Sequence, residues 1–151
     1  MALAVALALG VTGAPAHAFS GAGHLVTGAA LGRILAGDDE AAFVVGLASH
    51  ALMDALPHYD WGILEQVVAF AGAAWWLHEA YRRTGDARLL WGAAGAVLPD
   101  VETVLRRLGL LKVSVYPSHN GLAPHGRAGR RTGLFVEGGV VGLLGVAVAL
   151  P

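Results

Sequence analysis

The feature that most constrains this chain is a histidine and an aspartate placed four residues apart in the run GLASHALMDALPHYD. On an α-helix, residues four apart share one face, so His50 and Asp54 could hold one metal ion between them. Pro57 forces the preceding residue out of helical geometry, which ends the helix and leaves His58 and Asp60 in the exit turn. In the alternative interpretation, Asp54 is a buried acid paired with one histidine, and Asp60 caps the next helix.

The composition narrows the chemistry that this run can support. The chain has 151 residues, enough for one domain, and only 14% of them are charged, against about 25% in a typical soluble domain. A formal net charge of −1 gives no indication of a nucleic-acid partner. There are no cysteines, so any metal must be held by His, Asp and Glu. Such ligands favour Zn²⁺, or another divalent ion such as Mn²⁺.

The first 18 residues are typical of a signal peptide or a first membrane helix. Residues 1–10 are almost entirely Ala, Leu and Val, and Ala16-His17-Ala18 has the small-x-small form of a signal-peptidase site. No Lys or Arg precedes the apolar run, which keeps the membrane-helix alternative open. In either case the segment would deliver Phe19 to the outer face of a membrane.

A second apolar stretch, residues 133–150, is interrupted only by Glu137 and approaches the ~20 residues needed to span a bilayer. Gly138 and Gly142 have the small-x-x-x-small spacing of packed membrane helices. Arginines at 127, 130 and 131 precede the stretch and indicate a cytoplasmic flank. The partner expected from these features is a lipid membrane.

No long run alternates apolar and polar residues, so the sequence predicts an all-α chain without strands. The expected helices are 23–36, 40–56, 60–83, 86–98, a short one from Asp100, and 133–150, with a loop at 112–131. Because short turns join sequential helices, the prediction is an antiparallel, membrane-associated helical bundle forming a single domain over 19–151.

Antiparallel packing places the candidate ligands at one pole of the bundle and a group of arginines at the other. The ligand pole collects His24, His50, Asp54, His58, Asp60 and Asp100. The opposite pole collects Arg82, Arg83 and Arg88. Since positive residues favour the cytoplasmic side, the metal-site pole is expected to face the periplasm or exterior of a bacterial-type inner membrane. Charged groups in such apolar surroundings are costly and tend to be functional.

Three further residues are candidates on weaker grounds. Glu102 follows Asp100 by two positions and could bind metal or act as a general base, or could be a solvated acid. His119 and His125 lie in the loop and could close over the site as additional metal ligands, or could be exposed. Asp60 is the other candidate for a base or for a residue that orients a ligand.

Two runs, SHALMDALPHYD and GAVLPDVE, resemble the inner-membrane metal-dependent hydrolases, and the opening GHLVTG is similar to that family's start. That family is thought to be related to zinc-dependent phospholipase C. The run FSGAGH is similar to the mature start of zinc-dependent single-strand nucleases, where an aromatic residue's amino group and a His five residues later bind zinc. Here those positions are Phe19 and His24. The His-to-Asp-to-His spacing is tighter at its second interval than in those longer enzymes, so fewer metal ions are expected here than the three that they use.

The resemblance implies a metal-dependent hydrolase acting on phosphoesters, with a phospholipid-like substrate among the candidates. His50, Asp54, His58 and Asp100 would be ligands, with His24 completing a second site. The alternative is a non-enzymatic membrane protein whose His/Asp cluster binds or transports metal ions or protons. An open coordination position facing water would favour the enzyme, and a closed site would favour a structural role.

Overall fold

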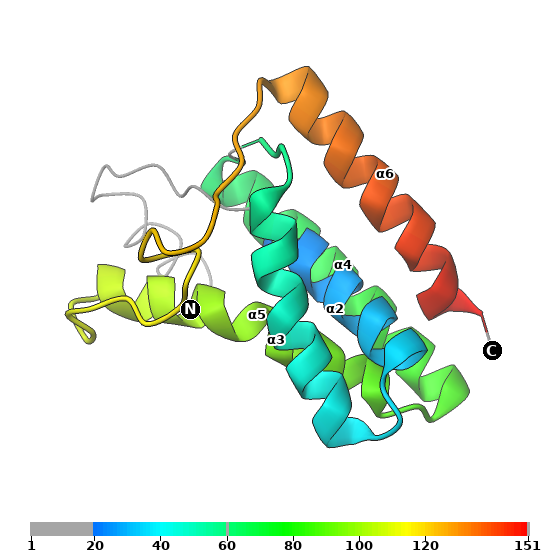
Figure 1. Ribbon diagram of the computed structural model, residues 1–151. Helices are drawn as coiled ribbons and strands as arrows, with labels where there is room; N and C mark the ends of the chain where they lie inside the picture. Colours follow the sequence, from blue (N-terminus) through cyan, green and yellow to red (C-terminus); the bar gives the residue numbers. More distant parts are fainter. Residues whose placement is uncertain (1–19, 60, 151) are drawn as a thin grey trace.

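The computed structural model describes residues 20–59 and 61–150, and all regular secondary structure in that part of the chain is helical (Figure 1). The helices are α2 (Gly21–Leu35), α3 (Asp39–Ala55), α4 (Ile63–Thr84), α5 (Arg88–Arg107) and α6 (Arg130–Ala149). The predicted all-α class is confirmed for the described residues. The candidate signal segment 1–18, Phe19 and Asp60 lie outside them.

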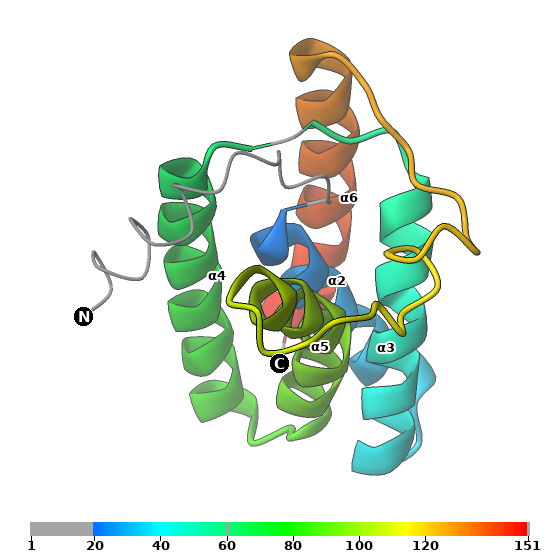
Figure 2. The same ribbon diagram turned by 90° about the vertical axis from the view of Figure 1, so that its left-hand side faces the viewer.

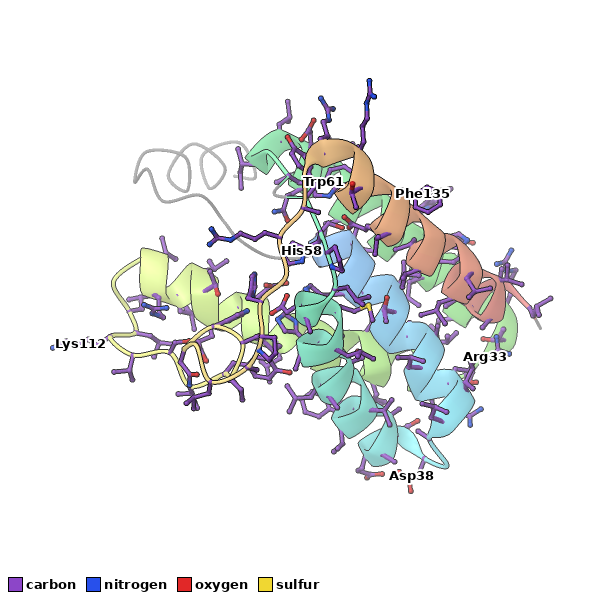
Figure 3. The ribbon with its side chains drawn as sticks, turned by 45° about the horizontal axis from the view of Figure 1, so that its top comes forward. Arg33, Asp38, His58, Trp61, Lys112 and Phe135 are labelled. Carbon is purple, nitrogen blue, oxygen red and sulfur yellow. The ribbon has the colours of Figure 1, made fainter. Side chains whose placement is uncertain are left out.

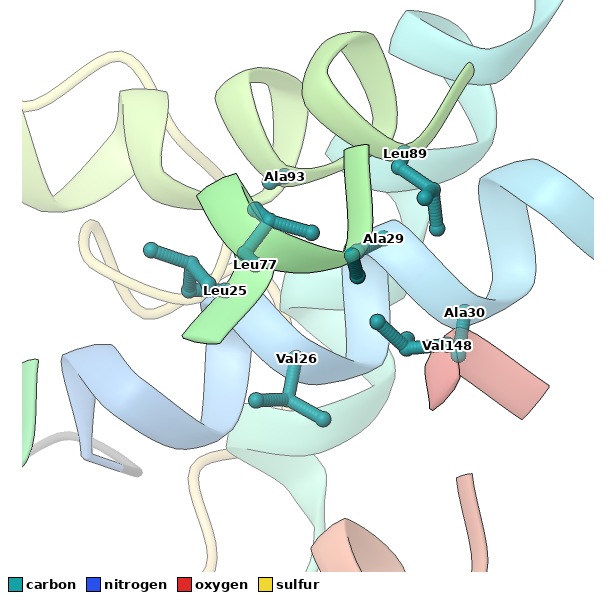
Figure 4. Close-up of a cluster of buried hydrophobic side chains, with 9 residues drawn as sticks. Leu25, Val26, Ala29, Ala30, Leu77, Leu89, Ala93 and Val148 are labelled. Carbon is teal, nitrogen blue, oxygen red and sulfur yellow. The ribbon is translucent and has the colours of Figure 1, made fainter. Parts of the chain in front are cut away.

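Helix α2 runs through the middle of the bundle and contacts each of the other four described helices (Figure 2). Its Ala and Val side chains let neighbouring helices pack closely around it. The core they form is drawn in Figure 4 and consists of Leu25, Val26, Ala29 and Ala30 with Leu77, Ala80, Leu89, Ala93 and Val148. This central position also brings the N-terminal turn of α2, which carries His24, into the interior.

Helices α2, α3 and α5 meet backbone to backbone at glycines. A Cβ atom added at Gly46 of α3 would overlap the carbonyl group of Gly92 in α5, and one added at Gly92 would overlap the carbonyl of Gly28 in α2. Only glycine permits this approach, because any side chain would push the helices apart.

The structure corrects one predicted boundary, the helix break at Pro99. Helix α5 continues without interruption from Arg88 to Arg107, with Pro99 inside it. An interior proline removes one helical hydrogen bond and costs roughly 3 kcal/mol. The close packing of α5 against both α2 and α3 opposes a break at this point, so the tertiary contacts outweigh the local preference.

Local signals do set the ends of α3. Asp38 accepts a hydrogen bond from the backbone N–H of Ala41 at 2.8 Å and so caps the start of the helix. The helix ends at Ala55, and Leu56, the residue before Pro57, is extended. The link that follows leads to α4 at the end of the bundle opposite Asp38, which Figure 3 labels at the far end.

The loop between α5 and α6 first projects away from the bundle and then returns along α3 (Figure 1). On its way back it is bound by two backbone hydrogen bonds, from Gly126 N–H to the Asp54 carbonyl at 2.7 Å and from Ala128 N–H to the His58 carbonyl at 2.9 Å. These bonds place the loop directly over the C-terminal turn of α3.

Helix α6 is the one described helix that is long and apolar enough to cross a membrane, judged by length and composition. It is anchored to the bundle by Glu137, a buried acid that accepts hydrogen bonds from the backbone and hydroxyl of Ser20 and, at 2.7 Å, from the indole of Trp61. Membrane association stays a prediction.

The arginines at the start of α6 lie at the same end of the bundle as His58, because Ala128, two residues before the helix, is hydrogen-bonded to it. The predicted cytoplasmic flank of α6 and the predicted exterior pole therefore occupy one end of the molecule. These two predictions are incompatible if the charge bias alone orients the chain.

Candidate metal centre

Asp54 is the centre of the site and is completely buried in the last turn of α3. His50, one turn earlier on the same face, places its Nε2 atom 3.2 Å from Asp54 Oδ2. His24, from the first turn of α2, places its Nε2 atom 3.2 Å from Asp54 Oδ1. The helical spacing thus supplies one imidazole, and the packing of α2 on α3 supplies the second.

The returning loop contributes further groups to the same carboxylate. The Ser118 hydroxyl donates a hydrogen bond to Asp54 Oδ2 at 2.6 Å. His119 Nε2 lies 3.5 Å from that oxygen, and His125 Nδ1 lies 3.7 Å from it. Asp54 is therefore surrounded by imidazoles from two helices and one loop, in a region where a lone charge would be costly.

Two of the histidines are oriented by backbone carbonyl groups. His50 Nδ1 lies 2.7 Å from the carbonyl oxygen of Ala96, and His58 Nδ1 lies 2.8 Å from that of Leu56. A carbonyl oxygen only accepts hydrogen bonds, so each Nδ1 carries a proton, and Nε2 is the ring nitrogen that can serve as a metal ligand. Metal-binding histidines are commonly held in this way, with the far nitrogen bonded to a carbonyl or carboxylate.

The donor atoms have the spacing that one ion requires. Two atoms at 2.0–2.1 Å from a tetrahedral zinc ion lie about 3.3 Å apart. Here the separation of the Nε2 atoms of His50 and His119 is 3.2 Å, and their separations from Asp54 Oδ2 are 3.2 and 3.5 Å. His24, His50 and Asp100 form a second group whose ligand atoms lie within 4.8 Å of one another. These buried His/Asp groups could hold a metal ion.

The electrostatics of the site keep Asp54 ionised. Burial by itself raises the pKa of Asp54, but hydrogen bonds with His119, His24 and His50 outweigh it and hold the pKa well below its usual range. Burial lowers the pKa of His24 and favours its neutral, ligand form. Burial also opposes protonation of His50, but Asp54 and then Asp100 overcome it and raise its pKa.

The first half of the loop is anchored by Tyr116 and Glu102. The Tyr116 hydroxyl donates to the carbonyl of Leu47 and accepts from the backbone N–H of Ala51 at 3.2 Å, and its ring lies edge-on to His50. The Glu102 carboxylate accepts hydrogen bonds from the Ser114 hydroxyl and from the backbone of the loop. Burial disfavours the Glu102 anion, but these bonds outweigh it and lower its pKa.

The predicted site residues divide into three sets. The structure brings five of them together around Asp54 or beside it in the second group: His24, His50, Asp100, His119 and His125. His58 is buried next to them, with its ring 5.0 Å from that of His125, where the link after α3 meets the returning loop (Figure 3). Glu102 holds the loop rather than reaching Asp54, and Asp60 is outside the described residues.

Three residues that sequence reasoning missed also matter. Ser118 fixes Asp54, Tyr116 braces the loop against α3, and Glu137 ties α6 to the start of α2. Ser118 directly precedes a candidate histidine, and Glu137 is the one acid in an apolar helix, so both could have been singled out from the sequence. No sequence pattern pointed to Tyr116, because its role depends entirely on the return of the loop.

Comparison of the chain with models of protein families, with curated proteins and with solved structures found no match in any of the three. The chemistry of this centre must therefore be inferred from its own residues.

Proposed function

We propose that this chain is a metal-dependent hydrolase that acts on phosphoesters. The observation that carries the proposal is the arrangement around Asp54, where imidazoles from α2, α3 and the returning loop meet one carboxylate at ligand spacing. A divalent cation at this point would accept these oxygen and nitrogen atoms as ligands and balance the buried charge of Asp54. The resemblance of its central runs to the inner-membrane metal-dependent hydrolases supports the same function.

His50, Asp54 and His119 would hold the ion, and His24 and Asp100 would complete a second position next to it. Nitrogen and oxygen donors without thiolates suit Zn²⁺ best and Mn²⁺ next. A bound divalent ion activates water for attack and polarises the phosphoryl oxygen. In the hydrolysis, the water oxygen bonds to phosphorus, the ester P–O bond breaks, and the departing oxygen takes up a proton.

The residues around the ion have separable tasks. The Ala96 carbonyl keeps the Nδ1 proton of His50 and turns its Nε2 atom inward. Ser118 occupies one lone pair of Asp54 Oδ2 and so fixes the plane of the carboxylate. The side chain of His125 is 19% exposed, whereas those of His24, His50 and Asp54 are fully buried. Substrate would therefore enter from the loop side.

We propose further that the chain is held in a bacterial-type inner membrane, with α6 as the span and the metal centre facing the periplasm or exterior. The length and apolar character of α6 support the span. The orientation rests on the signal-like segment 1–18, because arginines lie at both ends of the bundle.

A second candidate function is non-enzymatic binding or transport of metal ions or protons. The complete burial of His24, His50 and Asp54 favours it, because a saturated, closed site binds without reacting. The two candidates differ in whether water reaches the ion.

Metal content tests the proposal directly. Protein purified without a His tag should contain one or two zinc or manganese ions per chain, and Asp54→Asn should lose most of them. Asp38→Asn is the matched control, because Asp38 caps α3 at the opposite end and asparagine caps equally well. Less than about a tenth of an ion per wild-type chain, after metal is added back, would refute the metal centre.

Activity then separates the two candidates. The metal-loaded wild type should hydrolyse at least one member of a panel of phosphate mono- and diesters, and Asp54→Asn should not. Full metal loading with no hydrolysis across the panel would support the closed, non-enzymatic site.

A further inference from the structure

An apolar groove runs beside the metal centre, between α5, α3 and the outward half of the loop. It has a volume of about 570 Å³, within the usual range for small-molecule sites. Its walls include Leu47, Val101, Leu105, Leu111, Val115 and Tyr116. The lining is almost wholly hydrocarbon, which suits an alkyl chain and not a sugar or a nucleotide.

The one charged residue in the groove wall, Glu102, is already engaged. Its carboxylate accepts hydrogen bonds from the Ser114 hydroxyl and from the backbone N–H groups of Val115 and Tyr116. It therefore braces the wall and leaves the groove without a polar anchor of its own. Any polar group of a ligand must be bound elsewhere.

The groove and the metal centre share parts of their walls. Tyr116 lines the groove, and its ring lies 5.0 Å from that of His50 and 5.6 Å from that of His119. Pro99 and Pro117, which also line the groove, come directly before Asp100 and Ser118 in the sequence. A molecule lying in the groove thus has one end next to the candidate ligands.

The outer end of the groove is an exposed tip that is both apolar and basic. Leu110, Val113 and Val115 are 68%, 68% and 75% exposed. Lys112 stands among them, at the outermost point of the loop in Figure 3, and Arg106 is exposed nearby. Exposed leucines and valines beside positive charges fit the boundary between lipid chains and anionic headgroups.

We propose that this groove binds the alkyl chain of an anionic, single-chain amphiphile, whose phosphoester head then lies at the metal centre. The tip, with Lys112 and Arg106, would meet the lipid surface from which the molecule is taken. The inference deepens the proposed function and rests on it for the identity of the head group. Binding of the alkyl chain in the groove depends only on the apolar walls.

The test measures binding of two non-hydrolysable probes, dodecylphosphonate and butylphosphonate, to the full-length protein held in amphipol without detergent. Dodecylphosphonate should bind at least about tenfold more tightly, because burial of only two extra methylenes already accounts for that factor. Val101→Glu and Leu111→Glu, which place a charge in the groove, should abolish the preference for the long chain. Ile34→Glu is the control, since Ile34 is 55% exposed at the far end of α2.

The outcomes separate the two proposals. Equal affinity for the two probes in a metal-loaded protein would overturn the groove and leave the metal centre standing. A chain-length preference that the groove variants abolish, in a protein that binds no metal, would support the groove and remove the hydrolase. A preference for the long probe that survives both groove variants would place the alkyl chain elsewhere and overturn the inference. A dimer in light scattering that the probe does not alter would mean that a second copy of the protein covers the groove, and it would also overturn the inference.

Discussion

A carboxylate surrounded by basic side chains lies at each end of the bundle, and the two clusters differ in the kind of base. At the metal-centre end, Asp54 meets imidazoles and is fully buried. At the other end, Asp86 binds the guanidinium groups of Arg33 at 3.3 Å and Arg88 at 2.9 Å, and its side chain is 14% exposed. Arg88 also donates a hydrogen bond to the carbonyl of Ala36 at 2.9 Å and so caps the C-terminal end of α2.

The difference shows which cluster is complete by itself. A guanidinium group is always charged, so the negative charge of Asp86 is balanced without any further ion. The Asp86 cluster serves to join the turns at 36–38 and 85–87. An imidazole is mostly neutral at pH 7, so the Asp54 cluster gains its positive charge from protons or from a metal ion. The Asp86 cluster thus has its counter-charges built in, whereas the Asp54 cluster could hold a metal ion.

The largest expected effect is an all-or-none difference in accessibility between the two ends. The chain lacks cysteine, so Pro124→Cys and Gly37→Cys each introduce a single thiol, and both positions are exposed. A membrane-impermeant thiol reagent on intact cells should label position 124 and spare position 37. Both should react after the membrane is broken, and the reverse pattern on intact cells would place the metal centre in the cytoplasm.

Metal removal should distinguish the two ends next. A ligand at a thousand times its Kd stabilises the folded state by about 4 kcal/mol, so chelation should lower the Tm of the wild type by several degrees. Asp86→Asn should keep this response to chelator, and Asp54→Asn should lose it. Scanning calorimetry with and without EDTA measures both, and an equal response in the two variants would contradict the comparison.

Ser118→Ala should weaken metal binding by about 10- to 100-fold, the usual cost of losing a group that orients a ligand. The hydroxyl donates to Asp54 Oδ2, and alanine leaves that oxygen less well fixed. Thr84→Ala, which removes a hydroxyl at the opposite end, is the control and should leave the affinity unchanged. Competition with a zinc-binding dye gives the two dissociation constants, and equal values would rule out the role of Ser118.

The smallest effect concerns the pH dependence of the arginine end. The hydrogen bond from Arg88 is the main cause that lowers the pKa of Asp86. The stabilisation from ionised Asp86 is therefore present above its unfolded-state pKa of about 3.9, and it is lost as the pH falls through the lower pKa of the folded state. Asp86→Asn should cost roughly 1 kcal/mol at pH 7, given partial exposure, and much less at pH 2.5. Urea unfolding at the two pH values measures this loss in the free energy of unfolding, with Glu40→Gln as the control variant. An equal loss at both pH values would disprove the role of the Asp86–Arg88 ion pair.

Much of the fold follows from short-range signals in the sequence. The expected helices match α2, α3, α4 and α6 to within three residues at each end, because caps, turn glycines and Pro57 act locally. The placement of His50 and Asp54 on one face needed only the period of the helix. Pro99 is the exception, since the packing of α5 against two neighbours outweighs the cost of an interior proline.

The sequence by itself determined the helical class, the pairing of His50 with Asp54 and the absence of thiolate ligands. Only the tertiary structure decided that the loop turns back over α3 and brings Ser118, His119 and His125 to Asp54. The reason is physical: that path depends on hydrogen bonds between segments more than 60 residues apart, such as Ser118 to Asp54 and Tyr116 to Leu47. Local patterns do not encode such contacts, because they form only when α3, α5 and the loop are packed together.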